Sequence, residues 1–465
     1  MKPFSRFIIS HFEWDKSTLE AKFHYAFDDQ EHFSETINFS PLKNTSDFPL
    51  INQDTAAIHQ LLSHLHIALG VSYYKLYPTT EIIVETIPLS DAMKDFWHDF
   101  YIKGLGEFFY RNQINPTGLA QFLCTENSQG KTSSALEYSA EKVLILFGWG
   151  KDSLVSVELI KQKNLNFDLF SFGKEYPLHQ IAQEPTWAKR LIIQRTLDLV
   201  KIQKLLVEGY YNGHLPITGI ICFVTAVVSY LYGYKSVITS LEKSADFWNT
   251  DYHGLNINHQ RSKSSEFEES FRDYAQTYLL KNFECKSLIR NRYEIKVVQE
   301  FSKYPQYFHA FSSCNRNFHI TTCTKLTWDQ LRCWECPKCA FVYTMLRAFI
   351  GKSEVNDIFW ADLFEKADLI PLFKELLWIE GIKPFECVGT NEEMTLALWI
   401  ISKKEKSFSW MRVEVCEKRG KGIWAERREL HWALCSNGIS SSLIWWRIRP
   451  PTIHSWWIRL PTFFL

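Results

Sequence analysis

A glycine-containing turn, Gly148–Ser153 (GWGKDS), has the residue types of an anion-binding loop. It follows a continuous apolar run and precedes a segment with helical spacing, so its N–H groups lie at the positive end of a helix dipole. Gly150 allows close backbone approach to a phosphate, Lys151 adds positive charge, and Ser153 can donate a hydroxyl hydrogen bond. Asp152 can cap the helix or hold Mg²⁺ through water. The alternative is a strand–helix turn that binds no ligand.

A run of cysteines supplies a second candidate site, this one for a metal. Cys333, Cys336 and Cys339 form two consecutive CxxC steps, and 18 residues separate Cys314 from the first of them. The two steps place three thiolates around one turn, and a thiolate from a distant segment completes the tetrahedron that Zn²⁺ requires. We therefore predict structural Zn²⁺ at these four cysteines, with Cys323 as an alternative distal ligand. Free or redox-active thiols are the other interpretation.

Both candidate sites fall where strand-like and helix-like segments alternate. The predicted strands are Lys142–Phe147, Phe167–Phe172, Lys201–Val207 and Ser236–Thr239, and the predicted helices are residues 154–163, 183–197, 217–232 and 266–279. Such alternation is typical of βαβ units. We predict a catalytic domain over residues 136–400, with an α/β fold and a doubly wound, mostly parallel sheet.

The amino-terminal 135 residues predict a separate α+β domain. Short alternating runs at Lys22–Phe27 and Thr36–Phe39 indicate hairpin strands. A helical pattern follows at Ala56–Leu69, and a strand-like run at Glu81–Ile87. The polar stretch Cys124–Ser134 is the predicted linker to the catalytic domain.

Length and composition limit the class of protein. With 465 residues, 46% of them hydrophobic and 22% charged, the chain has the composition of a folded globular protein of two or three domains. The 52 basic and 52 acidic side chains balance, so no overall field attracts nucleic acid. The odd number of 11 cysteines and the lack of a secretory signal favour reduced thiols and a cytoplasmic protein. The apolar stretch Ile217–Tyr234 is interpreted as a buried helix, so no membrane span is expected.

The last 58 residues, from Phe408 onward, differ from the rest of the chain. They hold seven of the 17 tryptophans and nine basic residues against four acidic ones, without a sustained apolar period. A frameshifted or otherwise non-native terminus explains such a jump in composition, and an unusual surface extension is the alternative. The other 407 residues carry 43 basic and 48 acidic side chains, which weakens a nucleic-acid role further.

The GWGKDS turn resembles the SGGKDS loop of the PP-loop ATP pyrophosphatase superfamily, whose members cleave ATP to AMP and pyrophosphate. Trp149 stands where the superfamily has its first glycine, and this bulky side chain narrows the phosphate cradle. The resemblance implies an adenine nucleotide alpha hydrolase-like fold with ATP and Mg²⁺ as cofactors. The implied ATP-binding residues are Gly148, Gly150, Lys151, Asp152 and Ser153. The order of loop and cysteine cluster is similar to that in the 7-cyano-7-deazaguanine synthase family, whose cysteines hold a structural zinc.

Further segments point to a narrower family. They are SYYK at Ser72–Lys75, GHLP at Gly213–Pro216, NHQRSKSSEFE at Asn258–Glu268, SCN at Ser313–Asn315 and ECVGTNEE at Glu386–Glu393. In this order, with GWGKDS and CWECPKC, they resemble the bacterial UDP-N-acetylmuramoyl-L-alanyl-L-glutamate epimerase (MurL) family up to about residue 400. The resemblance implies inversion of the terminal L-glutamate of a UDP-MurNAc-dipeptide to D-glutamate, with release of AMP and pyrophosphate, in peptidoglycan precursor synthesis. It also implies functional coupling to the muramoyl ligases that act before and after. Another PP-loop adenylating enzyme and a non-catalytic nucleotide-binding relic are the alternatives.

The implied chemistry explains why such an epimerase uses ATP. The Cα proton of a peptide-linked glutamate is weakly acidic beside an anionic carboxylate, and conversion to an acyl-adenylate removes that charge. Lys151 and Mg²⁺, with Asp152 as a ligand, would neutralise the leaving pyrophosphate. His214, His259 and Lys263 are the implied proton-transfer candidates, because loops at strand ends hold ligands in α/β sheets. A local hydrogen bond for His214 and a solvated turn for the other two are the alternatives.

Overall fold

A ten-stranded mixed sheet runs through the computed structural model, which describes residues 2–124, 134–173, 175, 177–312, 314 and 331–405. Most of the predicted linker and the predicted tail from Phe408 lie outside the described residues, as does Cys323. Residues 1–401 form one unit, and the description below concerns that unit.

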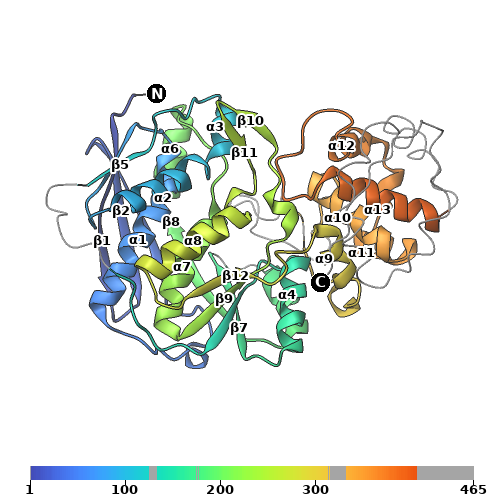
Figure 1. The fold of residues 1–465 in the computed structure, drawn as a ribbon, viewed down its shortest axis with the longest axis horizontal. Coiled ribbons are helices and arrows are strands. Elements are labelled where there is room, and N and C mark those ends of the chain that lie inside the picture. The colour runs from blue at the N-terminus through green and yellow to red at the C-terminus, as the bar shows by residue number, and fades with distance from the viewer. Residues whose placement is uncertain are drawn as a thin grey trace, which may run out of the picture. The chain divides into compact units, whose positions relative to one another are not determined.

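The sheet has the order β12-β9-β6-β7-β8-β3-β2-β1-β4-β5. Several of these strands are labelled in Figure 1, among them β1, β2 and β5 of one half and β7, β9 and β12 of the other. Its strands are β1 Arg6–Asp15, β2 Glu20–Phe27, β3 Glu31–Asn38, β4 Glu81–Val84, β5 Gln121–Cys124, β6 Lys142–Leu146, β7 Phe167–Phe172, β8 Arg190–Leu197, β9 Tyr234–Thr239 and β12 Glu284–Ser287. The β12-β9-β6-β7-β8 half is parallel throughout, as is the β1-β4-β5 edge. The pairs β8-β3, β3-β2 and β2-β1 are antiparallel. The prediction of a mixed α/β fold with a mostly parallel sheet is therefore confirmed.

The helices pack on this sheet and extend the fold beyond it. They are α1 Thr55–Tyr74, α2 Asp91–Ile102, α3 Gly106–Asn112, α4 Lys151–Gln162, α5 Pro177–Gln183, α6 Leu199–Val207, α7 Ile217–Tyr232, α8 Ser265–Tyr278, α9 Glu294–Phe301, α10 Pro337–Phe349, α11 Lys352–Phe359, α12 Ile370–Leu376 and α13 Asn391–Lys404. Helix α1 contacts β1, β2 and α7, whereas α4 contacts β6, β9 and α9. The predicted apolar helix is α7, most of whose residues are buried, and none of the helices in the described ranges is long and apolar enough to cross a membrane.

Two elements differ from the sequence prediction. The segment 183–197, predicted as a helix, ends in strand β8, and Lys201–Val207, predicted as a strand, belongs to helix α6. Strand β8 is held from both sides, by β7 and by β3, so its apolar start is buried by sheet pairing. Asp198 then caps α6 by accepting a hydrogen bond from the Lys201 backbone N–H at 3.3 Å. A short apolar run fits both the 3.6-residue period of a helix and the two-residue period of a strand, and here the pairing of strands decided between the two.

The two predicted regions share this one sheet, because β3 of the first pairs with β8 of the second. The carboxyl ends of the parallel strands β6, β9 and β12 lie side by side, since the strands pair in register. The segments that leave these three ends lead to Lys151, Glu242 and Glu294. This edge is where open α/β sheets bind ligands, and the acidic trio described below is built there.

Candidate functional site

The predicted phosphate loop joins β6 directly to α4. Trp149 has a left-handed backbone (φ 42°), is buried, and accepts a hydrogen bond from the Ser312 N–H at 3.0 Å. Ser153 donates its hydroxyl to the Gly150 carbonyl at 2.8 Å, within the first turn of α4. A Cβ atom at Gly148 would meet no atom within 4 Å, so open space adjoins the start of the loop.

Lys151 lies fully buried between two carboxylates. Its Nζ is 2.7 Å from Asp152 Oδ1 and also pairs with Glu294 at the start of α9. Burial alone lowers the pKa of Lys151, but the charges of Asp152 and Glu294 raise it above its ordinary value. In this arrangement the single positive charge of Lys151 is shared between two carboxylate neighbours.

An acidic trio surrounds this lysine. One carboxylate oxygen each from Asp152, Glu242 and Glu294 lies within 4.8 Å of the others. Burial, reinforced by the charge of Asp152, raises the pKa of Glu294 to about 7 and raises that of Glu242 as well. Three convergent carboxylates match the oxygen ligands that Mg²⁺ prefers.

A second cluster is centred on Cys387. His259 Nδ1 lies 2.5 Å from Glu107 Oε2, and its Nε2 lies 3.6 Å from Cys387 Sγ. Lys263 Nζ donates to the same sulfur at 2.9 Å. The ring of His214 lies against that of His259 in a tilted arrangement, with centroids 4.6 Å apart, and its Nδ1 is 3.4 Å from Glu107 Oε2. The three proton-transfer candidates of the sequence analysis therefore lie in one cluster, in which His259 and Lys263 contact the thiol and His214 contacts His259 and Glu107.

The charges of this cluster are mutually dependent. Burial raises the pKa of Cys387, but the charge of Lys263 and the hydrogen bond from His259 hold it well below its ordinary value. Burial lowers the pKa of His259, and its hydrogen bonds to Cys387 and Glu107 reverse this and raise the pKa to about 9. Burial holds the pKa of His214 at about 3, helped by the charge of His259. These shifts favour a thiolate at Cys387 between cationic Lys263 and His259, with His214 as a neutral imidazole.

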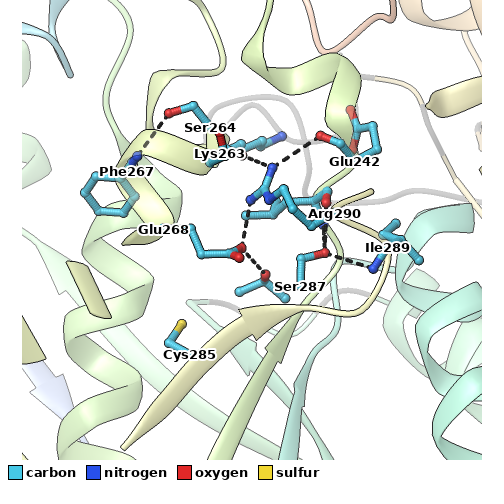
Figure 2. A network of polar contacts seen from close by, with 12 residues as sticks. Glu242, Lys263, Ser264, Phe267, Glu268, Cys285, Ser287, Ile289 and Arg290 are labelled. Carbon is cyan, nitrogen blue, oxygen red and sulfur yellow. Dashed lines mark hydrogen bonds and ion pairs between the residues drawn. The ribbon is translucent and has the colours of Figure 1, made fainter. Parts of the chain in front are cut away.

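Arg290 hydrogen-bonds to segments that carry residues of both the acidic trio and the Cys387 cluster (Figure 2). Its guanidinium donates to the backbone carbonyls of Glu242 at 3.3 Å and Lys263 at 3.0 Å, and to the Glu268 carboxylate at 2.8 Å. The segment after β9 and the segment before α8 are thereby held to the residues that follow β12. Burial raises the pKa of Asp152, and the charges of Lys151, Lys338 and Lys263 together lower it, so Lys263 of one cluster acts electrostatically on Asp152 of the other.

Asn249 fastens the Cys387 segment to the His259 loop. Its side-chain oxygen accepts from the His259 N–H at 2.9 Å, and its amide donates to the carbonyls of Lys383 and Pro384 at 3.1 and 2.9 Å. Lys338, in the first turn of α10, donates to the Cys387 carbonyl. Backbone contacts from three segments therefore fix the thiol relative to its partners.

The predicted metal cluster is assembled in the structure. The sulfurs of Cys314, Cys333, Cys336 and Cys339 all lie within 4.8 Å of one another, and Cys333 Sγ is 3.9 Å from Cys339 Sγ. A Zn²⁺ ion with bonds of about 2.3 Å requires sulfurs about 3.8 Å apart at the corners of a tetrahedron. The N–H groups of Cys336 and Cys339 donate to the preceding ligand sulfurs, as a thiolate turn requires. The four-cysteine donor set therefore fits zinc.

Sequence reasoning found part of this site and missed part. The polar segment Asn258–Glu268 supplies His259 and Lys263 to the cluster, and within it Arg261 pairs with Glu266 at 2.6 Å. Cys387 stood inside a quoted segment without a role, and Glu107 had no local signal at all. Ser313 and Asn315 lie outside the described residues.

The fold and these contacts define an α/β protein with an acidic trio beside the ends of its parallel strands, a cluster of titratable groups around Cys387 and a four-cysteine centre. Comparison with models of known protein families identifies the family. The family models described as the MurL N-terminal domain and the MurL C-terminal domain match residues 1–288 and 310–429, and the second match extends past Phe408. The chain belongs to the MurL family.

Three relatives align with this chain over most of their length and share one name. Proteins named UDP-N-acetyl-alpha-D-muramoyl-L-alanyl-L-glutamate epimerase from Xanthomonas oryzae pv. oryzae and a Micromonospora species are 31% and 32% identical to the chain. These alignments cover 87% and 86% of this chain and 88% and 87% of the relatives. A third protein of that name, from Salinispora tropica, is 31% identical over 86% of this chain and 85% of its own length.

Proposed function

We propose that this chain inverts the terminal L-glutamate of UDP-MurNAc-L-Ala-L-Glu to D-glutamate. The main support is sequence similarity to proteins named for that epimerisation, in alignments that cover nearly nine-tenths of both chains. The cluster of Glu107, His259, Lys263 and Cys387 supports it, because inversion at a carbon needs groups that accept and return a proton. The UDP-linked dipeptide is the proposed substrate, and coupling to the neighbouring muramoyl ligases and a cytoplasmic reaction follow from it.

ATP would drive this reaction by activating the glutamate carboxylate. We assign the strand β6, the GWGKDS turn and α4 to a PP-loop with an adenine nucleotide alpha hydrolase-like fold. The open space at Gly148 fits a phosphate, and Ser153 lies in the first helical turn beside Gly150. Transfer of AMP to the carboxylate would release pyrophosphate and leave an acyl-adenylate with a more acidic Cα–H.

The acidic trio would hold Mg²⁺ beside this loop. Asp152, Glu242 and Glu294 offer convergent oxygens, and Lys151 lies between two of them as a preformed countercharge. The ion would supply Lewis-acid stabilisation of the departing pyrophosphate. Lys151 remains charged in its buried setting, so it would stabilise the same anion if the carboxylates turn to the metal.

The proton-transfer groups would lie at the adjoining cluster. His259 and Lys263 carry positive charge and would stabilise the enolate that forms when the Cα proton leaves. His214 is neutral and lies against the carboxylate of Glu107. The four cysteines would hold zinc in a structural role, since all four donor positions are taken by thiols.

The test is incubation with ATP, Mg²⁺ and UDP-MurNAc-L-Ala-L-Glu in D₂O. The expected products are AMP, pyrophosphate and the D-glutamyl isomer with one deuterium at Cα. The free dipeptide L-Ala-L-Glu is the matched control for recognition of the UDP-muramoyl part. AMP formation that requires tRNA would instead indicate a tRNA-modifying enzyme. No AMP with any acceptor would indicate a non-catalytic nucleotide-binding relic. Inverted product without deuterium at Cα would exclude the proposed proton transfer.

A further inference from the structure

The thiol of Cys387 lies at the convergence point of the second cluster, in the segment between α12 and α13. Its sulfur is 2.9 Å from Lys263 Nζ and 3.6 Å from His259 Nε2, and its side chain is half-buried. Its own backbone carbonyl accepts from Lys338, so the residue is held at both ends. A cysteine packed for structure alone does not require two cationic donors on its sulfur.

We propose that the Cys387 thiolate is the base that removes the Cα proton of the activated glutamate, with Lys263 and His259 as positioning residues. This inference rests on the proposed epimerase function and names the group that performs its central step.

The cationic partners of the thiol are unsuited to accept a proton. The pKa of Lys263 is raised, because the charge of Cys387 and its hydrogen bond outweigh the effect of burial. The pKa of His259 is about 9. Both groups are therefore already protonated near neutral pH, and a cation with no free lone pair cannot act as a base.

The remaining histidine is a poor base for a different reason. Burial gives His214 a pKa of about 3, so it is neutral but binds a proton weakly. Cys387 combines an available electron pair with a fixed position beside two cations, whereas both carboxylate oxygens of Glu107 already accept hydrogen bonds, from His259 and Arg111. Its environment also includes Glu386 on its own segment, Glu107 of α3, Lys338 of α10 and Lys383, so its charge state depends on all of these elements.

The proposed step conserves atoms and charge. The Cα–H bond breaks as the S–H bond of Cys387 forms, and the electron pair of the C–H bond moves onto the activated acyl carbonyl as an enolate. Lys263 and His259 keep their protons and stabilise the negative charge as it moves from sulfur to the enolate oxygen. The proton of the inverted product then comes from a donor on the opposite face of Cα.

The decisive experiment separates activation of the carboxylate from proton removal. Cys387→Ala and the near-isosteric Cys387→Ser are compared with the wild-type enzyme for ATP–pyrophosphate exchange with UDP-MurNAc-L-Ala-L-Glu and for deuterium entry at Cα. We expect exchange within about threefold of wild type and at least about 100-fold slower deuterium entry in both variants. Cys124→Ala, which removes a cysteine from the edge strand β5, is the matched control and should keep both rates.

Several results would overturn the assignment. Deuterium entry at the wild-type rate in Cys387→Ala would exclude this thiol as the base, as would a glutamyl thioester on Cys387 seen by intact mass, which would make it a nucleophile. If the wild-type chain shows neither pyrophosphate exchange nor inversion, the proposed function is wrong. The rate of Cys387 alkylation then tests whether the thiol is activated by its cationic partners.

The reactivity measurement needs no turnover. Iodoacetamide should alkylate Cys387 at neutral pH faster than Cys124, as followed by peptide mass spectrometry. Lys263→Met should move the pH midpoint of Cys387 alkylation upward by about one unit or more, and Lys263→Arg should largely restore it. Equal midpoints in wild type and Lys263→Met would show that Lys263 does not position a thiolate.

Discussion

Replacing Glu107 by glutamine tests how the Cys387 cluster sets its charge state. Glu107 is buried on α3, and its Oε2 accepts from His259 Nδ1 at 2.5 Å. Its pKa is lowered, because the hydrogen bond and charge of His259 outweigh the effect of burial. Glu107→Gln keeps the shape and one acceptor but removes the charge.

The expected shift follows from the difference between a charged and a neutral acceptor. A hydrogen bond to an ionised group contributes about 1.5–3 kcal/mol, against about 0.5–1.5 kcal/mol for a neutral one. The difference of about 1.4 kcal/mol equals about one pKa unit. The pKa of His259 should fall from about 9 to about 8, so its protonated fraction at pH 8 drops from about nine-tenths to about half.

This substitution also changes how stability depends on pH. The pKa of His259 is raised on folding, so its protonation contributes stability that is fully present below about pH 6.5 and is lost as pH rises through about 9. Glu107→Gln should reduce that contribution by about 1.4 kcal/mol. Urea unfolding at pH 6 and pH 10 measures the difference directly.

The assay for the ionisation itself is an NMR titration of the histidine ring signals. Glu137→Gln is the matched control, because it removes a carboxylate from an exposed ion pair with Lys281. An unchanged His259 pKa in Glu107→Gln, or an equal shift in Glu137→Gln, would refute the view that Glu107 holds this imidazole in its cationic form.

Three further substitutions test the other parts of the site. Cys333→Ser should lower bound zinc below one equivalent by elemental analysis and reduce the melting temperature, and a full equivalent of zinc would contradict the four-cysteine centre. Trp149→Gly should relieve about 1–2 kcal/mol of left-handed strain but lose about 3–5 kcal/mol of buried packing, so urea unfolding should show net destabilisation. Lys151→Met should cost about 3–5 kcal/mol at pH 8, because two buried carboxylates lose their countercharge. The loss should be smaller at pH 5.5, where Glu294 with a pKa of about 7 is protonated, and an equal loss at both pH values would contradict this account.

The parts of the fold that could be predicted are those with a strong local signal. The buried strands β6 and β7 and the apolar helix α7 are continuous in sequence, and burial acts on each of them as a unit. The segment from β8 to α6 was predicted with its elements exchanged, because its short apolar runs fit both periods. Pairing of β8 with two neighbours, each distant in sequence, resolved that ambiguity.

Sequence spacing alone predicted three of the four ligands of the cysteine centre. Three of its thiols occupy one turn, so their convergence is a local property of the CxxC steps. The choice of Cys314 as the fourth required the fold, which places it within 4.8 Å of the others. The roles of Lys151 and Asp152 likewise depended on Glu294, more than 140 residues away.

The amino-acid sequence by itself determined the chemical inventory of this protein: a strand–glycine turn–helix with a lysine, a four-thiol donor set, and histidines and lysines placed in loops. Its order of motifs also determined the family. Only the tertiary structure decided which of these groups meet, since His259 lies 152 residues from Glu107 and 128 from Cys387. No local period or spacing encodes such contacts, because they arise when strand ends and loops are brought to one edge of a sheet. The same contacts then set the charges: burial raises the pKa of Cys387, and Lys263 and His259, which are distant in sequence, hold it well below its ordinary value.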